Sequence, residues 1–341
     1  MTGEVVALRV RRRQGLDVLD QTLLPGEERY IRLDDVPTLC EAITSLRVRG
    51  APFLGIIGAY GVAIANEAAR SLAALSAAAE RIVATRPTAA DLAWAVRGAL
   101  AAAHAAPPVA RADALWDFAD ALLASRGAAD QTIADAGAGL LAPGTAVLTH
   151  CNAGALATGG IGTALGVIRV AHERGLVERC LVTETRPLLQ GARLTAWELQ
   201  RLEIPTTLLP DGAAASLIAS GRIGAVVTGA DRIAANGDSA NKVGTLGLAL
   251  AAGYAGVPFY VAAPSSTIDP TCAHGGDIAI EFREAGEVGG FAGVRWAPDG
   301  LDAYNPAFDV TPATLIGAII TECGVLWPPF APAIAALPRK R

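Results

Sequence analysis

The sequence has few of the residues that cross-link a fold through disulfides or a bound metal ion. Its five cysteines are odd in number and far apart, and no two of them form a CxxC pair. The four histidines are equally scattered and show no HxxxH spacing. These patterns argue against a disulfide framework and a structural zinc site, and they give no support to metal catalysis.

An excess of positive charge and long apolar runs are also missing. The 28 basic residues face 33 acidic ones, and the run Arg11–Arg13 beside a turn is typical of a solvated surface. A nucleic-acid partner is therefore not expected, and a phosphorylated ligand would need local cations and backbone amides. The N-terminus lacks a signal-peptide pattern, and the apolar stretches are interrupted before the ~20 residues of a membrane helix. We expect a soluble, cytoplasmic protein with no membrane partner.

Apolar residues are abundant and make up 52% of the sequence, which is enough for a large core. A chain of 341 residues is also long enough for two domains. The first 140 residues predict a small β element followed by a helical domain. Two short strands are expected at 5–10 and 16–20, around a turn at Gln14-Gly15. The predicted helices are one capped by Asp34 or Asp35 that runs to about Ser45, and others at 55–68, 71–84, 89–105 and 111–137.

From Pro143-Gly144 onward, short β-rich runs alternate with helical runs. The predicted strands are 146–149, 180–183, 206–209, 225–228, 259–262 and 278–281, and the helices lie near 160–174, 193–203, 212–220 and 242–255. This alternation predicts an α/β domain over residues 141–341, with a Rossmann-like, doubly wound and mostly parallel sheet. In such sheets ligands bind outside the carboxyl ends of the strands, so functional residues should directly follow strands.

Cys151 follows the first of these strands, within Thr149-His-Cys-Asn-Ala-Gly154. A thiolate there would be stabilised by nearby amides, although a cysteine that packs as a small hydrophobe is an equally ordinary outcome. Gln190 follows the second strand, after Glu184 and Arg186, and such side chains can hold hydroxyls and a phosphate or form a loop salt bridge.

Asp231 follows the fourth strand in a Gly-Ala-Asp-Arg run, where partial burial would raise its pKa toward general acid–base use. Asn241 and Lys242 are expected to open a helix whose N-terminus favours a phosphate. The alternative is that Asp231 caps a turn and Lys242 is solvated, but the Gly-Ala-Asp-Arg run favours function.

In the N-terminal region, Arg49-Gly50-Ala51-Pro52 joins a cation to a backbone that can approach a ligand closely. Arg49 or Arg86 would reach an anion across a domain cleft, although single arginines are more often surface residues. The glycines at 160, 162 and 166 suggest a dinucleotide fingerprint, with Glu184 about twenty residues on. The last glycine comes one place late and the strand ends near His150, so no cofactor is expected.

Taken together, these segments resemble the methylthioribose-1-phosphate isomerase family. The resemblance extends from about Leu16 to Cys323, and seven runs in one order carry it. They are RGAP at 49–52, RPTA at 86–89, LTHCNAGALAT at 148–158, ETRPLLQGARLTAWEL at 184–199, GADRIAANGDSANKVGT at 229–245, PFYVAAPSSTID at 258–269 and NPAFDVTP at 305–312.

The resemblance implies an aldose–ketose isomerase of methionine salvage. It would convert 5-methylthio-α-D-ribose 1-phosphate to 5-methylthio-D-ribulose 1-phosphate, with Cys151 and Asp231 as the catalytic pair. The implied substrate-binding residues are Arg49, Gly50, Ala51, Arg86, Gln190, Asn241 and Lys242. The resemblance also implies a homodimer that needs neither a cofactor nor a metal.

Two alternatives stay open at this point. The first is an isomerase for a related sugar, 5-deoxyribose 1-phosphate or ribose 1,5-bisphosphate; the small apolar residues of THCNAGALAT favour an uncharged 5-group over a second phosphate. The second is a non-catalytic regulator like the related regulatory subunits of the translation-initiation exchange factor. Such a regulator is expected to lack the paired cysteine and aspartate, and this chain has both.

Overall fold

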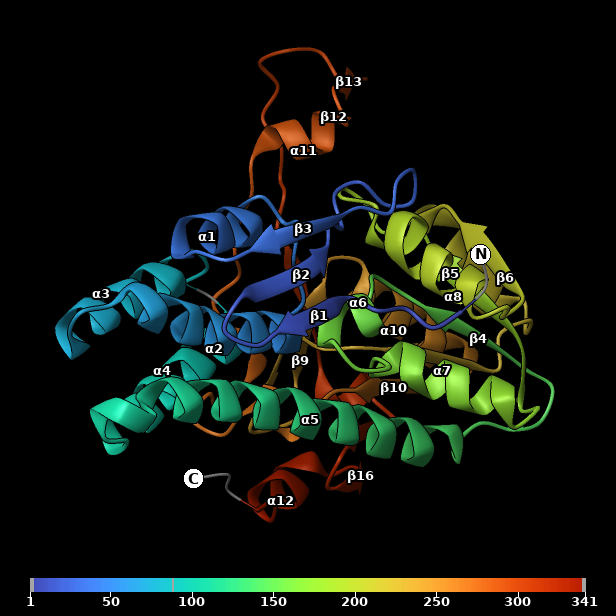
Figure 1. Cartoon of the computed structure of the whole chain (residues 1–341). Coiled ribbons are helices and arrows are strands. Elements are labelled where there is room, and N and C mark those ends of the chain that lie inside the picture. Colours follow the sequence, from blue (N-terminus) through green and yellow to red (C-terminus); the bar gives the residue numbers. More distant parts are fainter. Residues whose placement is uncertain (1–2, 88, 339–341) are drawn as a thin grey trace. The chain divides into compact units, whose positions relative to one another are not determined.

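The computed structural model describes residues 3–87 and 89–338, and their contacts divide the chain into two compact units (Figure 1). The N-terminal unit consists of Glu4–Asp130 and Gly154–Gly162. The sheet unit consists of Gln131–Ala153 and Thr163–Arg341, together with Met1–Gly3. The division at residue 140 was predicted from where strand–helix alternation begins, and it stays a prediction about domains.

The N-terminal unit combines a three-stranded antiparallel sheet with helices. Its elements are β1 (Leu8–Arg11), β2 (Gly15–Leu19), β3 (Tyr30–Leu33), α1 (Val36–Thr44), α2 (Ala51–Ala68), α3 (Leu72–Ala84), α4 (Ala90–Ala105), α6 (Ala155–Thr158) and most of α5 (Arg111–Ala138). The cap predicted at α1 is confirmed, since the Asp35 carboxylate accepts from Thr38 N at 2.7 Å. The third strand, Tyr30–Leu33, was not predicted.

α2 forms the apolar centre of the N-terminal unit, with Phe53 through Ala65 buried. Among the described residues it is the helix that is long and apolar enough to cross a membrane by length and composition alone, which was not noticed in the sequence. Most of α2, 72%, is nevertheless buried inside the structure, as in the core helix of a soluble protein.

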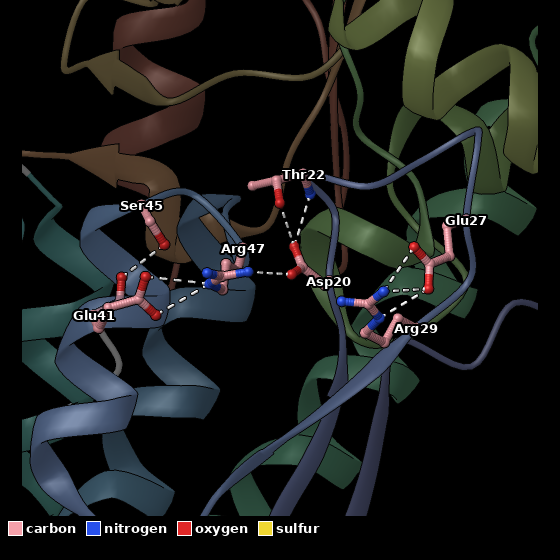
Figure 2. A network of polar contacts seen from close by, with 7 residues as sticks. All are labelled: Asp20, Thr22, Glu27, Arg29, Glu41, Ser45 and Arg47. Carbon is pink, nitrogen blue, oxygen red and sulfur yellow. Dashed lines mark hydrogen bonds and ion pairs between the residues drawn. The ribbon is translucent and has the colours of Figure 1, made fainter. Parts of the chain in front are cut away.

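A polar network fixes the chain that enters this helix (Figure 2). The buried Asp20 carboxylate accepts from Arg47 Nη1 at 2.5 Å and from Thr22 N at 3.0 Å. Arg47 Nε also donates to Glu41 on α1, at 3.1 Å. A buried carboxylate is stable only when it is paired and hydrogen-bonded, so these contacts hold the Arg47–Gly50 segment against β2 and α1.

The glycines near 160 have a structural explanation in the N-terminal unit. Asp130 on α5 accepts from Thr158 Oγ1 at 2.5 Å and from Gly162 N at 3.0 Å. A Cβ on Gly160 would lie 2.5 Å from an Asp130 oxygen, and Gly162 has a φ of +88°. The glycines therefore let the backbone of this segment pass close to a buried carboxylate. This packing explains the glycine pattern without a bound dinucleotide.

The sheet unit is built on a seven-stranded sheet in the order β16-β15-β10-β7-β4-β5-β6. These strands are β4 (Thr145–Thr149), β5 (Val177–Thr183), β6 (Thr206–Leu209), β7 (Ala225–Thr228), β10 (Phe259–Ala262), β15 (Ala318–Thr321) and β16 (Gly324–Leu326). Every neighbouring pair is parallel except β15 with β16. From β6 to β15 this is the 3-2-1-4-5-6 order of a Rossmann-like fold, which confirms the predicted fold class.

Helices and two smaller sheets complete the sheet unit. The helices are α7 (Ala164–Glu173), α8 (Ala196–Arg201) preceded by a π-helical turn at Gly191–Thr195, α9 (Ala214–Ala219), α10 (Thr245–Ala255), α11 (Ala285–Gly289) and α12 (Phe330–Ala335). A four-stranded sheet has the order β11 (Ile268–Asp269), β8 (Arg232–Ala234), β9 (Ser239–Lys242) and β14 (Phe308–Thr311). α11 leads into a hairpin of β12 (Gly290–Phe291) and β13 (Val294–Arg295), drawn in orange in Figure 1.

Five of the six predicted sheet strands are confirmed, and one was wrong. Residues 278–281 form no strand; Ile278 and Ile280 instead pack in a small cluster with Ala234 and Ala240. The sixth parallel strand is Ala318–Thr321. Both segments are short and apolar, and periodicity alone cannot separate a buried strand from a buried loop of that length.

Candidate active site

Two of the predicted residues follow neighbouring strands at the centre of the sheet. β4 pairs in parallel with β7 through Val147–Ala225 and Leu148–Val226, and Cys151 and Asp231 follow those two strands. From β4 the sheet grows in one direction through β5 and β6, and from β7 it grows in the other through β10 and β15. The two residues therefore flank the topological switch point, where doubly wound sheets bind ligands.

The Cys151 loop is held in an unusual backbone conformation. Cys151 has a φ of +63°, its N–H donates to Thr185 Oγ1 at 2.9 Å, and its carbonyl accepts from Thr195 Oγ1 at 2.5 Å. The next residue, Asn152, donates from Nδ2 to Glu198 at 2.7 Å. These bonds overdetermine the backbone, and the thiol is half-buried, so Cys151 is not a fully buried core cysteine.

Asp231 is placed differently from what its sequence context predicts. Its backbone N–H donates to Ala240 O on β9 at 2.9 Å, which fixes the turn after β7. Its side chain is exposed, so the expected partial burial was wrong. The reason is local: Asp231 lies on the turn into the small sheet, beyond the buried strand residues Ala225–Thr228.

Lys242 connects the two residues electrostatically. Its ammonium is buried, donates to Ala307 O at 2.8 Å and lies 4.9 Å from the centre of the Phe308 ring. Burial lowers the pKa of Lys242, while the charges of Cys151 and Asp231 raise it. The ammonium therefore lies within electrostatic range of both the thiol and the carboxylate.

The helix predicted to begin at Asn241 begins later. Asn241 and Lys242 end β9, and α10 starts at Thr245. The Asp309 carboxylate accepts from Gly244 N at 2.7 Å and Leu246 N at 3.1 Å. The expected helix start was therefore wrong, and a phosphate bound at this helix end would have to compete with Asp309. Phosphate binding by Asn241 and Lys242 stays a prediction. Asn241 is buried and donates to Thr245 Oγ1 at 3.0 Å.

Gln190 has the clearest mark of a ligand contact. It lies directly before the π-helical turn, and only 7% of the residue is exposed. Within the described part of the chain, its Oε1 is buried and has no hydrogen-bond partner. The same holds for the hydroxyls of Thr149 and Thr228, the last residues of β4 and β7. Unsatisfied polar atoms at one sheet edge are typical of a site that awaits a polar ligand.

Arg186 connects its loop to α11 and to Trp296, the residue after β13. It donates from Nη2 to Val288 O at 2.8 Å, and its guanidinium lies 4.9 Å from the centre of the Trp296 ring. The carboxylate that organises this loop is Asp211 after β6, which accepts from Thr185 N at 2.8 Å and Arg186 N at 2.7 Å. Asp211 was not singled out from the sequence, where nothing distinguishes it from a helix cap.

The remaining predicted residues lie in the N-terminal unit. Arg49 Nε donates to Gln21 Oε1 at 3.0 Å, and the buried Gln21 donates in turn to Leu156 O on α6 at 2.8 Å. Gly50 has a φ of +99°, and a Cβ there would lie 2.4 Å from Ala157 O. Ala51 begins α2, and Arg86 is half-buried just after α3. The close approach at Gly50 is thus to the chain itself.

The sequence also gave no role to His150, although the structure buries it beside Cys151. Its ring contacts Thr183 Oγ1 and Val243 O, at 2.6 and 2.9 Å. Across residues 3–87 and 89–338, no three His, Cys, Asp or Glu side chains are grouped so that they would hold a metal ion.

The strand order is that of a doubly wound, Rossmann-like fold, and Cys151 and Asp231 follow the two strands at its switch point, where such sheets bind ligands. Comparisons with known proteins identify the family. The model of the initiation factor 2 subunit family matches residues 47–328. A methylthioribose-1-phosphate isomerase from Anaeromyxobacter sp. (strain Fw109-5) is 52% identical over 94% of both chains. That from Pelotomaculum thermopropionicum is 48% identical over 92% of this chain and 89% of its own.

Solved structures agree with these relatives. The crystal structure of 5-methylthioribose 1-phosphate isomerase from Pyrococcus horikoshii OT3 has a TM-score of 0.92 at 38% identity, over 98% of this chain and 96% of its own. Translation initiation factor eIF-2B subunit delta from A. fulgidus has a TM-score of 0.88, also at 38% identity, over 98% and 100%. The chain belongs to the methylthioribose-1-phosphate isomerases, within the initiation factor 2 subunit family.

Proposed function

We propose that the protein converts 5-methylthio-α-D-ribose 1-phosphate to 5-methylthio-D-ribulose 1-phosphate in methionine salvage, and that Cys151 and Asp231 carry the chemistry. The activity rests on relatives that bear this name at about 50% identity. The residue assignment rests on one observation: Cys151 and Asp231 follow the two strands that flank the switch point.

The substrate explains why two reactive groups are needed. The anomeric oxygen carries the phosphate, so the ring cannot open as a free sugar does. The C1–O4 bond must break while O4 gains a proton, the hydrogen on C2 must move to C1, and the C2 hydroxyl must lose its proton as the ketone forms. Asp231 gives the proton to O4 and takes one from the C2 hydroxyl, which returns the carboxyl group to its starting state.

Cys151 acts at the C2–C1 transfer in one of two ways. In an enolate route its thiolate takes the C2 proton and returns it to C1. In a hydride route the hydrogen moves directly to C1, and the cysteine stabilises the developing charge. Turnover in deuterated water tests the hydride route: solvent deuterium appears at C1 only if the Cys151 thiol exchanges its proton with solvent in the enolate route, so incorporation would exclude direct hydride transfer.

Substrate binding is assigned to Arg49, Gly50, Ala51, Arg86, Gln190, Asn241 and Lys242. The unpaired Gln190 Oε1 supports a contact with a substrate hydroxyl, and the buried Lys242 supports a contact with an anion. A cytoplasmic homodimer completes the proposal, with its domain boundary near residue 140 and the segment Gly154–Gly162 belonging to the N-terminal unit.

A regulator of the initiation-factor type is the second candidate. The A. fulgidus structure with that name is 38% identical to this chain, the same identity as the P. horikoshii isomerase. An assay of the purified protein on 5-methylthioribose 1-phosphate decides between the two. For the isomerase, Cys151→Ser and Asp231→Asn should each lower kcat by ~10²–10⁴-fold. The exposed Cys323→Ser and Asp302→Asn serve as matched controls and should not change it.

An inactive wild-type protein would overturn the isomerase assignment, and two fully active variants would overturn the residue assignment. The same assay on 5-deoxyribose 1-phosphate and ribose 1,5-bisphosphate tests the related-sugar alternatives. We expect the methylthio sugar to have the highest kcat/KM of the three.

A further inference from the structure

His150 lies where three loops of the sheet unit meet. It follows β4 directly and precedes Cys151, and only 2% of it is exposed. Nδ1 lies 2.6 Å from Thr183 Oγ1 at the end of β5, and Nε2 lies 2.9 Å from Val243 O, one residue after Lys242. A Cβ on Gly244 would lie 3.0 Å from the ring, so the turn after Lys242 also packs directly on the imidazole.

The partners of the ring fix its tautomer. The Val243 carbonyl can only accept, so Nε2 carries the hydrogen. Burial lowers the pKa of His150, which favours the neutral ring, and Nδ1 then accepts from the Thr183 hydroxyl. The imidazole therefore donates to one loop and accepts from another.

The Thr183 hydroxyl extends this arrangement back to Cys151. Thr183 Oγ1 lies 3.2 Å from Thr185 Oγ1, and Thr185 Oγ1 accepts from Cys151 N at 2.9 Å. The hydrogen bonds can all point one way, from Cys151 N–H through the two threonine hydroxyls to the imidazole and on to Val243 O. A chain of aligned hydrogen bonds is mutually reinforcing, and both of its ends lie beside residues of the proposed site.

We propose that His150 is a positioning residue. Its two hydrogen bonds hold the left-handed backbone of Cys151 at a fixed position relative to the Lys242–Gly244 turn. The role rests on the proposed function, because it matters to catalysis only if Cys151 and Lys242 act on the substrate. Displacements of about 1 Å in such constellations can lower rates by ~10²-fold.

Two variants test the role at different strengths. His150→Leu fills a similar volume and removes both hydrogen bonds, and Thr183→Val removes the hydroxyl link while the Val243 contact stays. The matched control is His172→Leu, since His172 also contacts a carbonyl in this unit, Val177 O at 2.9 Å, but on α7 at the other edge of the sheet.

Three quantities are measured for each variant: kcat and KM well below its Tm, the Tm itself, and the rate at which iodoacetamide alkylates Cys151, with Cys323 as internal reference. We expect His150→Leu to lower kcat by ~10–100-fold and Thr183→Val by less, and both to change the Cys151 alkylation rate at least about threefold. His172→Leu should lower Tm only.

Unchanged kcat, KM and Cys151 alkylation in both His150→Leu and Thr183→Val, with only Tm lowered, would overturn the role and leave His150 as a core residue. The alkylation readout does not depend on isomerase activity. If the wild type lacks that activity and the alkylation rate still changes, the proposed function fails and the positioning of Cys151 stands.

Discussion

The two edges of the seven-stranded sheet differ in how they make tight turns. At the amino edge, the residues with left-handed backbone just before β4, β5, β7 and β10 are Gly144, Gly175, Gly221 and Gly256. An added Cβ on any of them would meet nothing within 4 Å. Glycine adopts this conformation at no steric cost, so these turns are relaxed; Glu203 before β6 is the exception.

At the carboxyl edge, the first left-handed residues after β4 and β5 carry side chains. They are Cys151, Thr185 and Leu189, with φ values of +63°, +66° and +57°. Each such residue costs roughly 1–2 kcal/mol relative to an ordinary backbone. The same edge holds the unpaired buried oxygens of Thr149, Gln190 and Thr228. Strained backbone and unsatisfied buried oxygens thus occur together at the edge where the site is assigned.

The largest contrast is expected in thiol reactivity. Cys151 at the carboxyl edge is half-buried, whereas Cys180 inside β5 is fully buried and burial raises the pKa of its thiol. In the folded protein, iodoacetamide should modify Cys151 at least about 100-fold faster than Cys180. Mass spectrometry of timed samples measures both rates. Equal rates would mean that the Cys151 loop is closed to solvent.

Gln190→Leu should raise KM by about tenfold, because one hydrogen bond to the substrate is worth about 1.4 kcal/mol. The free energy of unfolding should not fall, since the substitution removes an unpaired buried oxygen. Steady-state kinetics and urea denaturation measure the two effects. Gln200→Leu on α8 is the control and should leave KM unchanged. A loss of stability without a change in KM would show that Gln190 is structural.

At the amino edge, Gly175→Ala should lower the free energy of unfolding by ~1–2 kcal/mol, because alanine is strained at a φ of +71°. With open space around the position, kcat and KM should stay at their wild-type values. Urea denaturation and the isomerase assay check both. A large fall in kcat would contradict the separation of the two edges.

The pH dependence of stability should report the buried His150. Burial lowers its pKa from 6.5, with Asp211 raising it and Lys242 lowering it further by charge. Below pH 6.5 the unfolded chain therefore binds a proton that the folded chain does not. The free energy of unfolding should fall as pH drops, by at most about 1.4 kcal/mol per pH unit, and His150→Leu should remove this slope. Equal slopes in both proteins would contradict a neutral His150.

The smallest effect is expected from two inactive variants of Cys151. Glycine tolerates a φ of +63° and alanine does not, so Cys151→Gly should be more stable than Cys151→Ala by ~0.5–1 kcal/mol. Cys180→Gly against Cys180→Ala should show the opposite order, because Cys180 lies within a strand. Equal stabilities at position 151 would mean that its backbone relaxes freely.

Sequence reasoning predicted the features that depend on local pattern. Five strands, the cap at Asp35 and the positions of Cys151 and Asp231 after strands all follow from apolar runs and what comes next. It failed where a distant residue decides the outcome. Asp309 is more than sixty residues from the helix end it caps. His150 went unassigned because its partners lie at Thr183 and Val243.

The membership of Gly154–Gly162 in the N-terminal unit has a practical consequence for anyone who would dissect this protein. The segment begins three residues after Cys151, yet Gln21, Gly50 and Asp130 are its neighbours. If the chain were divided near residue 140, the first fragment would lack α6. The second fragment would carry the apolar segment around Leu156 without the residues it packs against. The two units are interlaced along the chain, so neither can be expressed, swapped or transplanted as a contiguous module without loss.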